Sequence, residues 1–148
     1  MLFKALSAAV YGIDANIIDV EVDFSGIQTQ EDHFHNVQTS SPRLAKDGTV
    51  NVSVDVTNTG AVAGDAVVQL YVKHLQSKVE RPREELEGFQ RVSVRPNETK
   101  TVEIPLKASQ LAYWEEKENK FQVETEPVSL MVGDSSADIK LDTTVQVQ

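Results

Sequence analysis

The sequence predicts an all-β sandwich, because short strand patterns alternate with turn residues along most of the chain. Valine occupies every second position from 50 to 56 within residues 49–58, which sends valines and polar residues to opposite faces of a sheet. Residues 66–73 are apolar on almost both faces, as in a central strand, so that only Gln69 and Lys73 reach water. About seven such strands are typical of a sandwich rather than of a helical or parallel-sheet fold.

The other expected elements follow from the same alternation and from the turns between them. Further strands are predicted at residues 89–94, 101–106, 121–123, 128–132 and 139–147. Turns are predicted at residues 58–60, 95–97, 126–127 and 133–136, and residues 109–114 suggest one helical turn. Near the N-terminus, residues 17–24 alternate apolar and acidic side chains, so they are expected to form a strand whose open edge needs a partner.

Composition narrows the classes of function. The 148 residues carry a formal net charge of -9, which argues against a surface that binds nucleic acid. There is no cysteine, so disulfides, thiolate nucleophiles and cysteine-bound zinc are excluded. No run approaches the ~20 apolar residues of a membrane span, and the first residues make no convincing signal peptide. Taken as it stands, the sequence indicates a soluble protein, with the bacterial cytoplasm as its compartment.

An ordered series of motifs then suggests a family. The motifs lie at residues 49–60, 63–65, 67–72, 81–82, 85–92, 98–102 and 132–139. In this order they resemble the fibronectin type III-like module at the C-terminal end of glycoside hydrolase family 3 β-glucosidases and β-xylosidases. The resemblance implies an immunoglobulin/fibronectin type III-like β-sandwich at about residues 48–148. It also implies a non-catalytic module, because the nucleophile and the acid/base of that family belong to catalytic domains that precede it.

Two turns depart from the pattern of the resembled family. Pro96-Asn97 stands where Pro-Gly is usual, and asparagine also tolerates positive φ, so this turn is expected to survive. Glu126-Pro127 stands where a second Pro-Gly is usual, which leaves the type of that turn open.

The segment before the module has a different likeness. Residues 6–15, 20–25 and 33–35 are similar to the extreme N-terminus of magnesium-chelatase-like AAA+ ATPases of the competence type. The similarity stops at Val37, and no later segment matches a phosphate-binding loop. We therefore expect a strand-forming extension at residues 1–37, a linker at 38–47 and the sandwich at 48–148.

The candidate catalytic and metal-ligating residues are explained more simply as solvent-exposed polar side chains. His33 and His35 lie two apart, as metal ligands on one side of a strand would, but His74 is the only other histidine. The paired carboxylates are interpreted as solvated charge rather than as the two acids of a glycosidase; they are Glu84 with Glu85, Glu115 with Glu116, and Asp134 with Asp138. We expect no metal, no cofactor and no enzymatic activity.

Residues 77–89 form the most informative predicted loop. Arg81-Pro82 presets an extended turn, and Leu86 and Phe89 offer apolar surface between charged neighbours. These four residues are candidates for docking to a glycoside hydrolase catalytic domain or to a second copy of the chain in a homodimer. The alternative is that Leu86 and Phe89 close one end of the sandwich.

A binding function of another class rests on aromatic side chains. Trp114 and Tyr113, with Phe121 nearby, could form a platform that stacks on a sugar ring, which would make the chain a carbohydrate-binding module. The competing interpretation is that this single tryptophan packs in the core or at its rim. The main prediction is a structural or interaction module.

Overall fold

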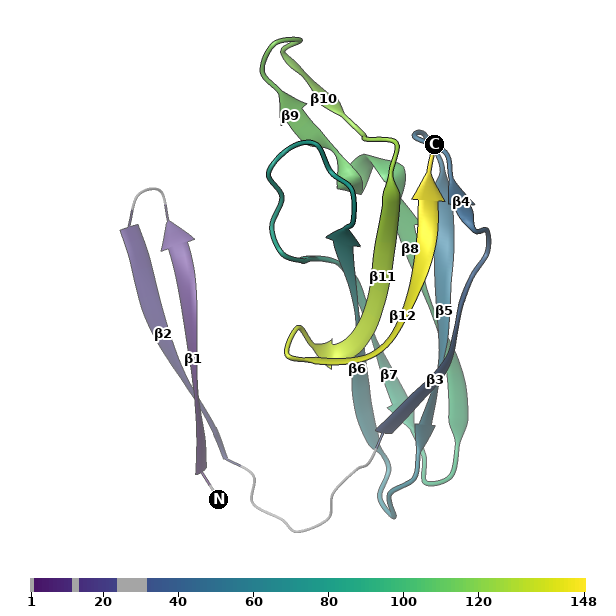
Figure 1. The fold of residues 1–148 in the computed structure, drawn as a ribbon. Coiled ribbons are helices and arrows are strands. Elements are labelled where there is room, and N and C mark those ends of the chain that lie inside the picture. Colours follow the sequence, from purple (N-terminus) through teal and green to yellow (C-terminus); the bar gives the residue numbers. More distant parts are fainter. Residues whose placement is uncertain (1, 12–13, 24–31) are drawn as a thin grey trace.

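The strands form two packed sheets and two hairpins (Figure 1). The structure, a computed structural model, describes the backbone of residues 2–11, 14–23 and 32–148 and the side chains of 32–148. Its elements are β1 (Leu2–Tyr11), β2 (Asp14–Asp23), β3 (Asp32–Thr39), β4 (Arg43–Leu44), β5 (Thr49–Asn58), β6 (Gly64–His74), β7 (Glu85–Val94), β8 (Thr99–Lys107), the 3-10 helix η1 (Ala108–Leu111), β9 (Tyr113–Glu115), β10 (Lys120–Gln122), β11 (Pro127–Ser135) and β12 (Asp138–Val147).

The two sheets have an order that sequence neighbours alone do not determine. The larger sheet has the order β4-β12-β11-β6-β7, and the smaller has the order β3-β5-β8. Pairing is antiparallel except between β12 and β4, which run parallel. This arrangement confirms the predicted all-β sandwich.

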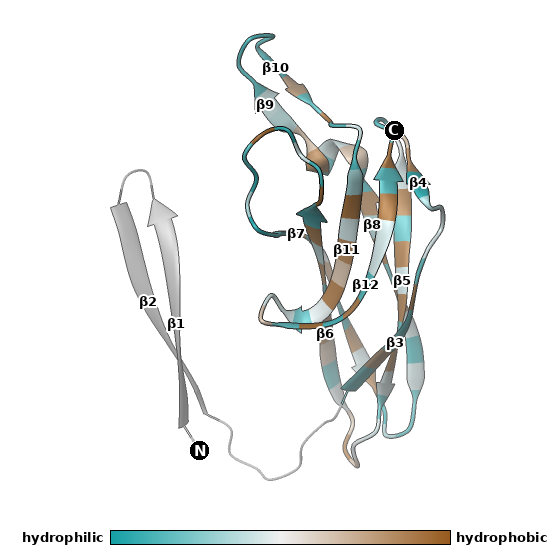
Figure 2. Ribbon diagram, in the orientation of Figure 1, coloured by the Kyte–Doolittle hydropathy of each residue, from teal (hydrophilic) through white to brown (hydrophobic). Residues whose placement is uncertain are grey.

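The core lies between the facing surfaces of the two sheets. The valines at 50, 52, 54 and 56 are at most 1% exposed, as the alternation in β5 predicts. Each such side chain contributes roughly 1.5–3 kcal/mol on burial. Apolar residues alternate along the sandwich strands in the same way (Figure 2). The repeated valines therefore account for both the strand and its orientation.

The sheets begin earlier than the predicted boundary at residue 48. β3 pairs with β5, and β4 pairs with β12, so residues from the expected extension and linker lie in the two sheets. The sequence did not place β3 in the sandwich, because the buried Phe34 stands among polar neighbours and gives too little alternation to define a strand. A register shift after His35, next to the positive φ of 55° at Asn36, also breaks its alternation.

The N-terminal segment forms the expected strand structure. β1 and β2 pair antiparallel, from Leu2 opposite Asp23 to Tyr11 opposite Asp14. The predicted strand at 17–24 thus belongs to β2, and Phe24 lies outside the described residues. β1 is the partner that the open edge of the predicted strand required.

Asparagines support two turns of the sandwich. Asn97 has a φ of 60°, as expected from its place in the Pro-Gly position. Asn58 is fully buried, and its side-chain amide donates to the carbonyls of Val62 and Val94 at 2.8 and 3.0 Å. The same side chain accepts from the Gly60 amide at 2.9 Å, so one asparagine holds the predicted turn at 58–60.

The remaining turn predictions need small adjustments. The helical turn ends at Leu111, so Tyr113 and Trp114 belong to β9 instead. β11 continues through Ser135, with register shifts around Gly133, where an added Cβ would lie 2.3 Å from the Asp138 carbonyl oxygen. Within the described residues, no helix has the length and apolar character needed to span a bilayer.

Candidate partner-binding surfaces

An apolar surface lies on the outer face of the larger sheet. Phe89 is 69% exposed, Leu86 is 51% exposed, and Val67 on the neighbouring strand is 40% exposed. We call these three residues the β7 patch. Phe89 lies opposite Gln69 and Leu86 lies opposite Tyr71 in the pairing of β7 with β6. Exposed apolar side chains that gather on one sheet face are candidates for a surface that another molecule covers.

A bulge and a glycine give the β7 patch its orientation. The register of β7 against β6 shifts between Leu70 and Tyr71, so both Leu86 and Phe89 lie opposite residues of the outer face. Gly88 points inward, and a Cβ added there would lie 2.5 Å from Cγ2 of Ile104 in the core. Glycine therefore allows β7 to pack closely on β8 while its neighbours face outward.

Polar residues surround the β7 patch. Arg91, directly after Gln90, forms an ion pair with Asp65 across the strands, and Ser93 donates to the same carboxylate. These bonds lower the pKa of Asp65, the bond from Ser93 having the largest effect. Burial raises the pKa of Glu87 at the other end, although its bond from Gln110 opposes this. An apolar centre within a polar rim is the usual anatomy of a protein interface.

The loop between β6 and β7 is held by the largely buried carboxylate of Glu124. One oxygen accepts from the Lys78 amide at 2.8 Å, and the other accepts from the Ser77 hydroxyl at 2.5 Å and from Arg81 at 3.3 Å. The side chains of Arg81 and Glu124 are only 10% and 12% exposed. Burial pushes the pKa of Glu124 upward, but these hydrogen bonds outweigh it and leave the pKa lowered.

Glu126 holds the beginning of the same loop. Its side chain is 2% exposed, lies 2.6 Å from Nδ1 of His74, and accepts from the Gln76 amide at 2.9 Å. Nε2 of His74 lies 3.7 Å from the Glu85 carboxylate. We call Glu124 and Glu126, with Arg81 and His74, the loop clasp. The loop clasp was not predicted from the sequence, although the two acidic residues Glu124 and Glu126, two apart in the connector before β11, were a visible signal.

The loop clasp also contains a possible set of metal ligands. His74, Glu124 and Glu126 offer ligand atoms within 4.8 Å of one another. Every carboxylate oxygen of the two glutamates already has a hydrogen-bonding partner in the protein, and Arg81 adds positive charge beside them. This set of bonds fits a structural clasp better than a metal site.

The clasp changes the interpretation of Arg81. Its guanidinium donates to the Leu111 carbonyl at 3.0 Å and lies 5.1 Å from the centre of the Tyr113 ring. Arg81 thus points into the protein, while Pro82 is exposed on the loop. Of the four docking candidates, Leu86 and Phe89 are the two that present exposed apolar side chains.

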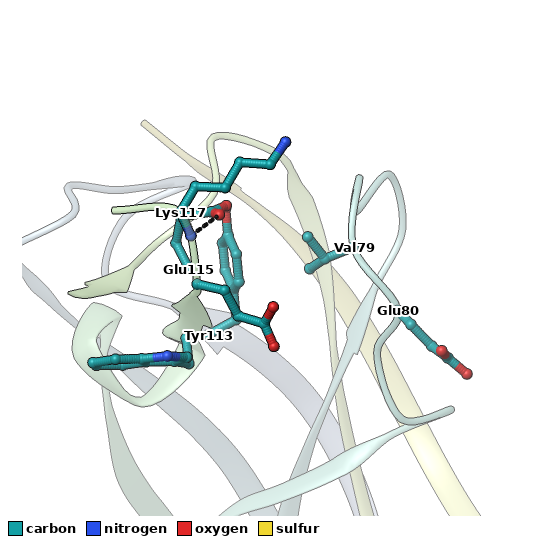
Figure 3. Close-up of a pocket in the computed structure, with 7 residues that line it drawn as sticks. Val79, Glu80, Tyr113, Glu115 and Lys117 are labelled. Carbon is teal, nitrogen blue, oxygen red and sulfur yellow. Dashed lines mark hydrogen bonds between the residues drawn. The ribbon is translucent and has the colours of Figure 1, made fainter. Parts of the chain in front are cut away.

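A second surface lies beside the β9–β10 hairpin. It is an open depression of about 460 Å³ between that hairpin and the β6–β7 loop (Figure 3). We call it the hairpin depression; its lining residues are Val79, Glu80, Tyr113, Trp114, Glu115, Glu116 and Lys117. The Glu115 side chain accepts from the Lys117 amide at 3.1 Å, which fixes the turn of the hairpin.

The aromatic residues of the hairpin are not arranged as the sequence suggested. Trp114 lies opposite Phe121 across the strands, with ring centres 5.1 Å apart and planes at 73°. Tyr113 precedes Trp114 in the strand and therefore points to the other side of the ribbon, toward Arg81. Burial and the neighbouring Glu115 raise the pKa of Tyr113. The exposed aromatic pair is thus Trp114 with Phe121, rather than Trp114 with Tyr113.

The other candidate residues lie on the surface of the sandwich. His33 and His35 flank the buried Phe34 in β3, so they face away from the core. The Lys140 amine lies 3.6 Å from the carboxylate of Asp134 and 2.6 Å from that of Asp138. Lys140 therefore forms an ion pair with each of these two acidic residues. Burial raises the pKa of Asp134, and Lys140 opposes that shift.

Comparisons with known proteins agree with the β-sandwich fold. Residues 66–136 match the model of the fibronectin type III-like domain. The chain is 35% identical over 122 residues to the thermostable beta-glucosidase B of Acetivibrio thermocellus, covering 82% of this chain and 16% of that protein. It is also 35% identical over 105 residues to the periplasmic beta-glucosidase of Salmonella typhimurium, covering 71% of this chain and 14% of that protein.

A solved structure extends the likeness to three dimensions. The family 3 (GH3) beta-glucosidase of Bifidobacterium adolescentis superimposes with a TM-score of 0.74 and 31% identity, covering 83% of this chain and 18% of that one. The chain spans about a sixth of the length of the relatives it matches. The match of 122 residues is longer than the segment 48–148, so it includes residues before the predicted boundary.

Proposed function

We propose that this fibronectin type III-like sandwich is a non-catalytic module of a family 3 glycoside hydrolase and that it packs its β7 patch against the catalytic part of that enzyme. The β-glucosidases it resembles are about five times as long as the chain, so the module accompanies a much larger body in those proteins. Its function would be structural, because covering the patch stabilises both partners.

The observation that carries this proposal is the exposure of Leu86 and Phe89. Phe89 is 69% exposed and Leu86 is 51% exposed, so burying them against a partner would be favourable, and both lie on a sheet strand rather than in a loop. Their polar rim would supply the hydrogen bonds at the border of an interface. A second copy of this chain is the competing occupant.

The proposal assigns no chemistry to the chain itself. We expect the purified chain to leave aryl β-glucosides, aryl β-xylosides and ATP unchanged. Turnover that co-purifies with the protein and disappears when one of its own carboxylates is replaced would contradict this expectation.

A chimera tests the module role. The matched C-terminal segment of the Acetivibrio thermocellus β-glucosidase would be replaced by this chain, and hydrolysis of an aryl β-glucoside would be measured. We expect the chimera to remain folded and active, whereas the same enzyme with the segment simply deleted loses stability. If the chimera and the deletion unfold at the same temperature, this chain does not perform the module's function.

The N-terminal segment is a separate part of the proposal. We keep its likeness to magnesium-chelatase-like ATPases as a proposed origin for the β1–β2 strand pair, without any nucleotide chemistry. The compartment also stays a proposal: the cytoplasm remains the expectation from the sequence, while one of the relatives is a periplasmic enzyme.

A further inference from the structure

His74 differs from the other two histidines of the chain because its side chain is buried. It is the last residue of β6, where it continues the inward-facing row that includes Leu70 and Val72 with the same period of two. Its side chain is only 3% exposed. Glu126 comes two residues before the inward-facing Val128 of β11, which pairs with β6 at His74, so the two polar side chains meet at one end of the core.

The bond to Glu126 decides which ring nitrogen of His74 carries the proton. Nδ1 lies 2.6 Å from Oε1 of Glu126, and a carboxylate can only accept a hydrogen bond. Nδ1 is therefore the donor, and in the neutral ring Nε2 holds an unshared electron pair. Metal-ligating histidines commonly donate from the other nitrogen to a carboxylate, because that bond fixes the tautomer and makes the free nitrogen a better ligand.

Nε2 of His74 is buried and has no hydrogen-bonding partner in the described part of the chain. A polar atom in this position costs free energy, since it has lost water and gained no bond in return. The carboxylate of Glu85 lies 3.7 Å from Nε2, too far for a hydrogen bond. Zinc bonds of about 2.0–2.2 Å in a tetrahedron place two ligand atoms about 3.4 Å apart, so a small movement of the Glu85 side chain would admit the ion.

Glu85 supplies the open side of this arrangement. It is the first residue of β7 and lies opposite the inward-facing Val72, so it stands on the same side of the sheet as His74. Its side chain is 34% exposed, which gives an ion a route from solvent. Glu87 adds a second negative charge nearby: burial has the largest effect in raising its pKa, and Glu85 raises it further while His74 lowers it.

We propose that Nε2 of His74 and the carboxylate of Glu85 bind a zinc ion, with water in the remaining positions. Imidazole with carboxylate suits zinc, whereas magnesium and calcium prefer oxygen ligands alone. The ion would join the end of β6 to the start of β7 and close the base of the loop between them. The sequence-based expectation of no metal weighed His33 and His35, which lie on the surface.

The zinc site is independent of the proposed function. The loop clasp already uses Nδ1 of His74, whereas the zinc site uses the opposite nitrogen of the same ring. The site also uses no residue of the β7 patch, so either proposal can fail without the other.

A zinc titration of the 148-residue chain tests the site directly. Histidine side-chain nitrogen NMR spectra report each ring nitrogen separately. We expect zinc chloride to shift Nε2 of His74 with a Kd below about 1 mM, to leave its Nδ1 protonated, and magnesium chloride to have no such effect. A shift confined to His33 and His35, or no saturable shift at His74, would overturn the proposal.

A charge-removing variant separates ligation from general attraction. Glu85→Gln keeps the size of the side chain and should weaken zinc binding at His74 by about tenfold or more, because a ligand is lost. The matched control is Glu84→Gln, the same change at the preceding residue, which should alter the affinity by less than about twofold since salt screens its charge. Equal losses in the two variants would contradict ligation by Glu85.

Thermal unfolding gives a readout that does not depend on spectroscopy of the ring. His74→Asn retains an amide that can donate to Glu126 in place of Nδ1, and it removes Nε2. We expect zinc to raise the unfolding midpoint of the wild type and not that of this variant, because an ion that binds only the folded state stabilises it. Should His74→Asn fail to fold, Glu85→Gln provides the same comparison. Equal stabilisation of the wild type and the folded variant would place the ion elsewhere and overturn the proposal.

Discussion

The two halves of residues 77–89 differ in which side chains are buried. In the first half, the charged side chain of Arg81 is 10% exposed and binds Glu124 inside the protein. In the second half, the apolar side chain of Phe89 is 69% exposed on the sheet surface. The usual preference, with charges outside and apolar groups inside, is thus reversed along one continuous stretch of chain.

The difference teaches that the available partners, not the polarity of a residue, decide which way each side chain points here. Arg81 finds a carboxylate, a carbonyl and an aromatic ring in its own chain, and these offset the loss of water. Phe89 lies on the outer face, where Gln69 is its cross-strand neighbour and the core is on the other side of the sheet. The loop clasp joins parts of this chain to one another, whereas the β7 patch is the surface that we propose for another molecule.

The largest expected effect is the loss of the loop clasp. Replacing Arg81 by methionine leaves the Glu124 carboxylate largely buried without its cation. We expect the free energy of unfolding to fall by about 2–4 kcal/mol, somewhat less than for a fully buried pair. Urea unfolding measures this change, with the exposed Lys117→Met as a control that stays within about 0.5 kcal/mol. Equal stability of the two variants would show that Arg81 is not part of a clasp.

A smaller effect is expected at the glycine that orients the patch. Gly88→Val places a side chain against Ile104 in the core, where a Cβ alone already lies 2.5 Å from Cγ2. We predict a loss of about 1–3 kcal/mol, measured by urea unfolding, because the core has no room to expand. Gln90→Ala, an exposed change on the same strand, serves as the control. Similar stabilities for both variants would remove the argument that Gly88 sets the packing of β7.

The pH dependence of stability sharpens the role of Glu124. Its pKa is lowered below the ordinary value of 4.5, so the folded state binds its proton less readily than the unfolded state does. The stability it contributes is therefore present above the ordinary value and is lost as pH falls through the lowered pKa. Urea midpoints from about pH 6 to about pH 3 should fall less steeply for Glu124→Gln than for the wild type. Parallel curves would contradict the lowered pKa.

The smallest effect on stability is expected at the β7 patch itself. Leu86→Asp with Phe89→Ser should change the free energy of unfolding of the isolated chain by less than about 1 kcal/mol, because both side chains are exposed. The same variant should abolish any self-association. Sedimentation at low and high salt checks this, and salt should favour a wild-type dimer because it screens the net charge of -9 on each copy. A wild-type chain that is monomeric throughout would leave the catalytic part of an enzyme as the sole proposed occupant.

The strands with strong alternation could be predicted from the sequence, and the two early strands could not. The valines from 50 to 56 define both the period and the buried face of β5. β3 has Phe34 as its buried anchor and a bulge after His35, so its place in the sheet depends on pairing with β5 rather than on its own pattern. Strand order in the sheets likewise depends on contacts between distant segments, which periodicity does not contain.

The candidate surfaces were predicted in part. Exposure of Leu86 and Phe89 follows from a pattern that places apolar residues between charges, and one of the two alternatives left open was a surface role. The inward turn of Arg81 could not be predicted, because its partner Glu124 lies 43 residues away in the sequence. The pairing of Trp114 with Phe121 depends on the register of the hairpin, which a short strand signal does not specify.

The most direct test of the central claim is the effect of Leu86→Asp with Phe89→Ser on thermal unfolding in two settings. In the isolated chain, where the β7 patch faces water, the midpoint should shift by less than about 3 °C. In the chimera with the Acetivibrio thermocellus β-glucosidase, the same variant should lower the midpoint by several degrees more, because the substitutions then disrupt an interface. The same small shift in both settings would contradict the claim that the β7 patch is a docking surface.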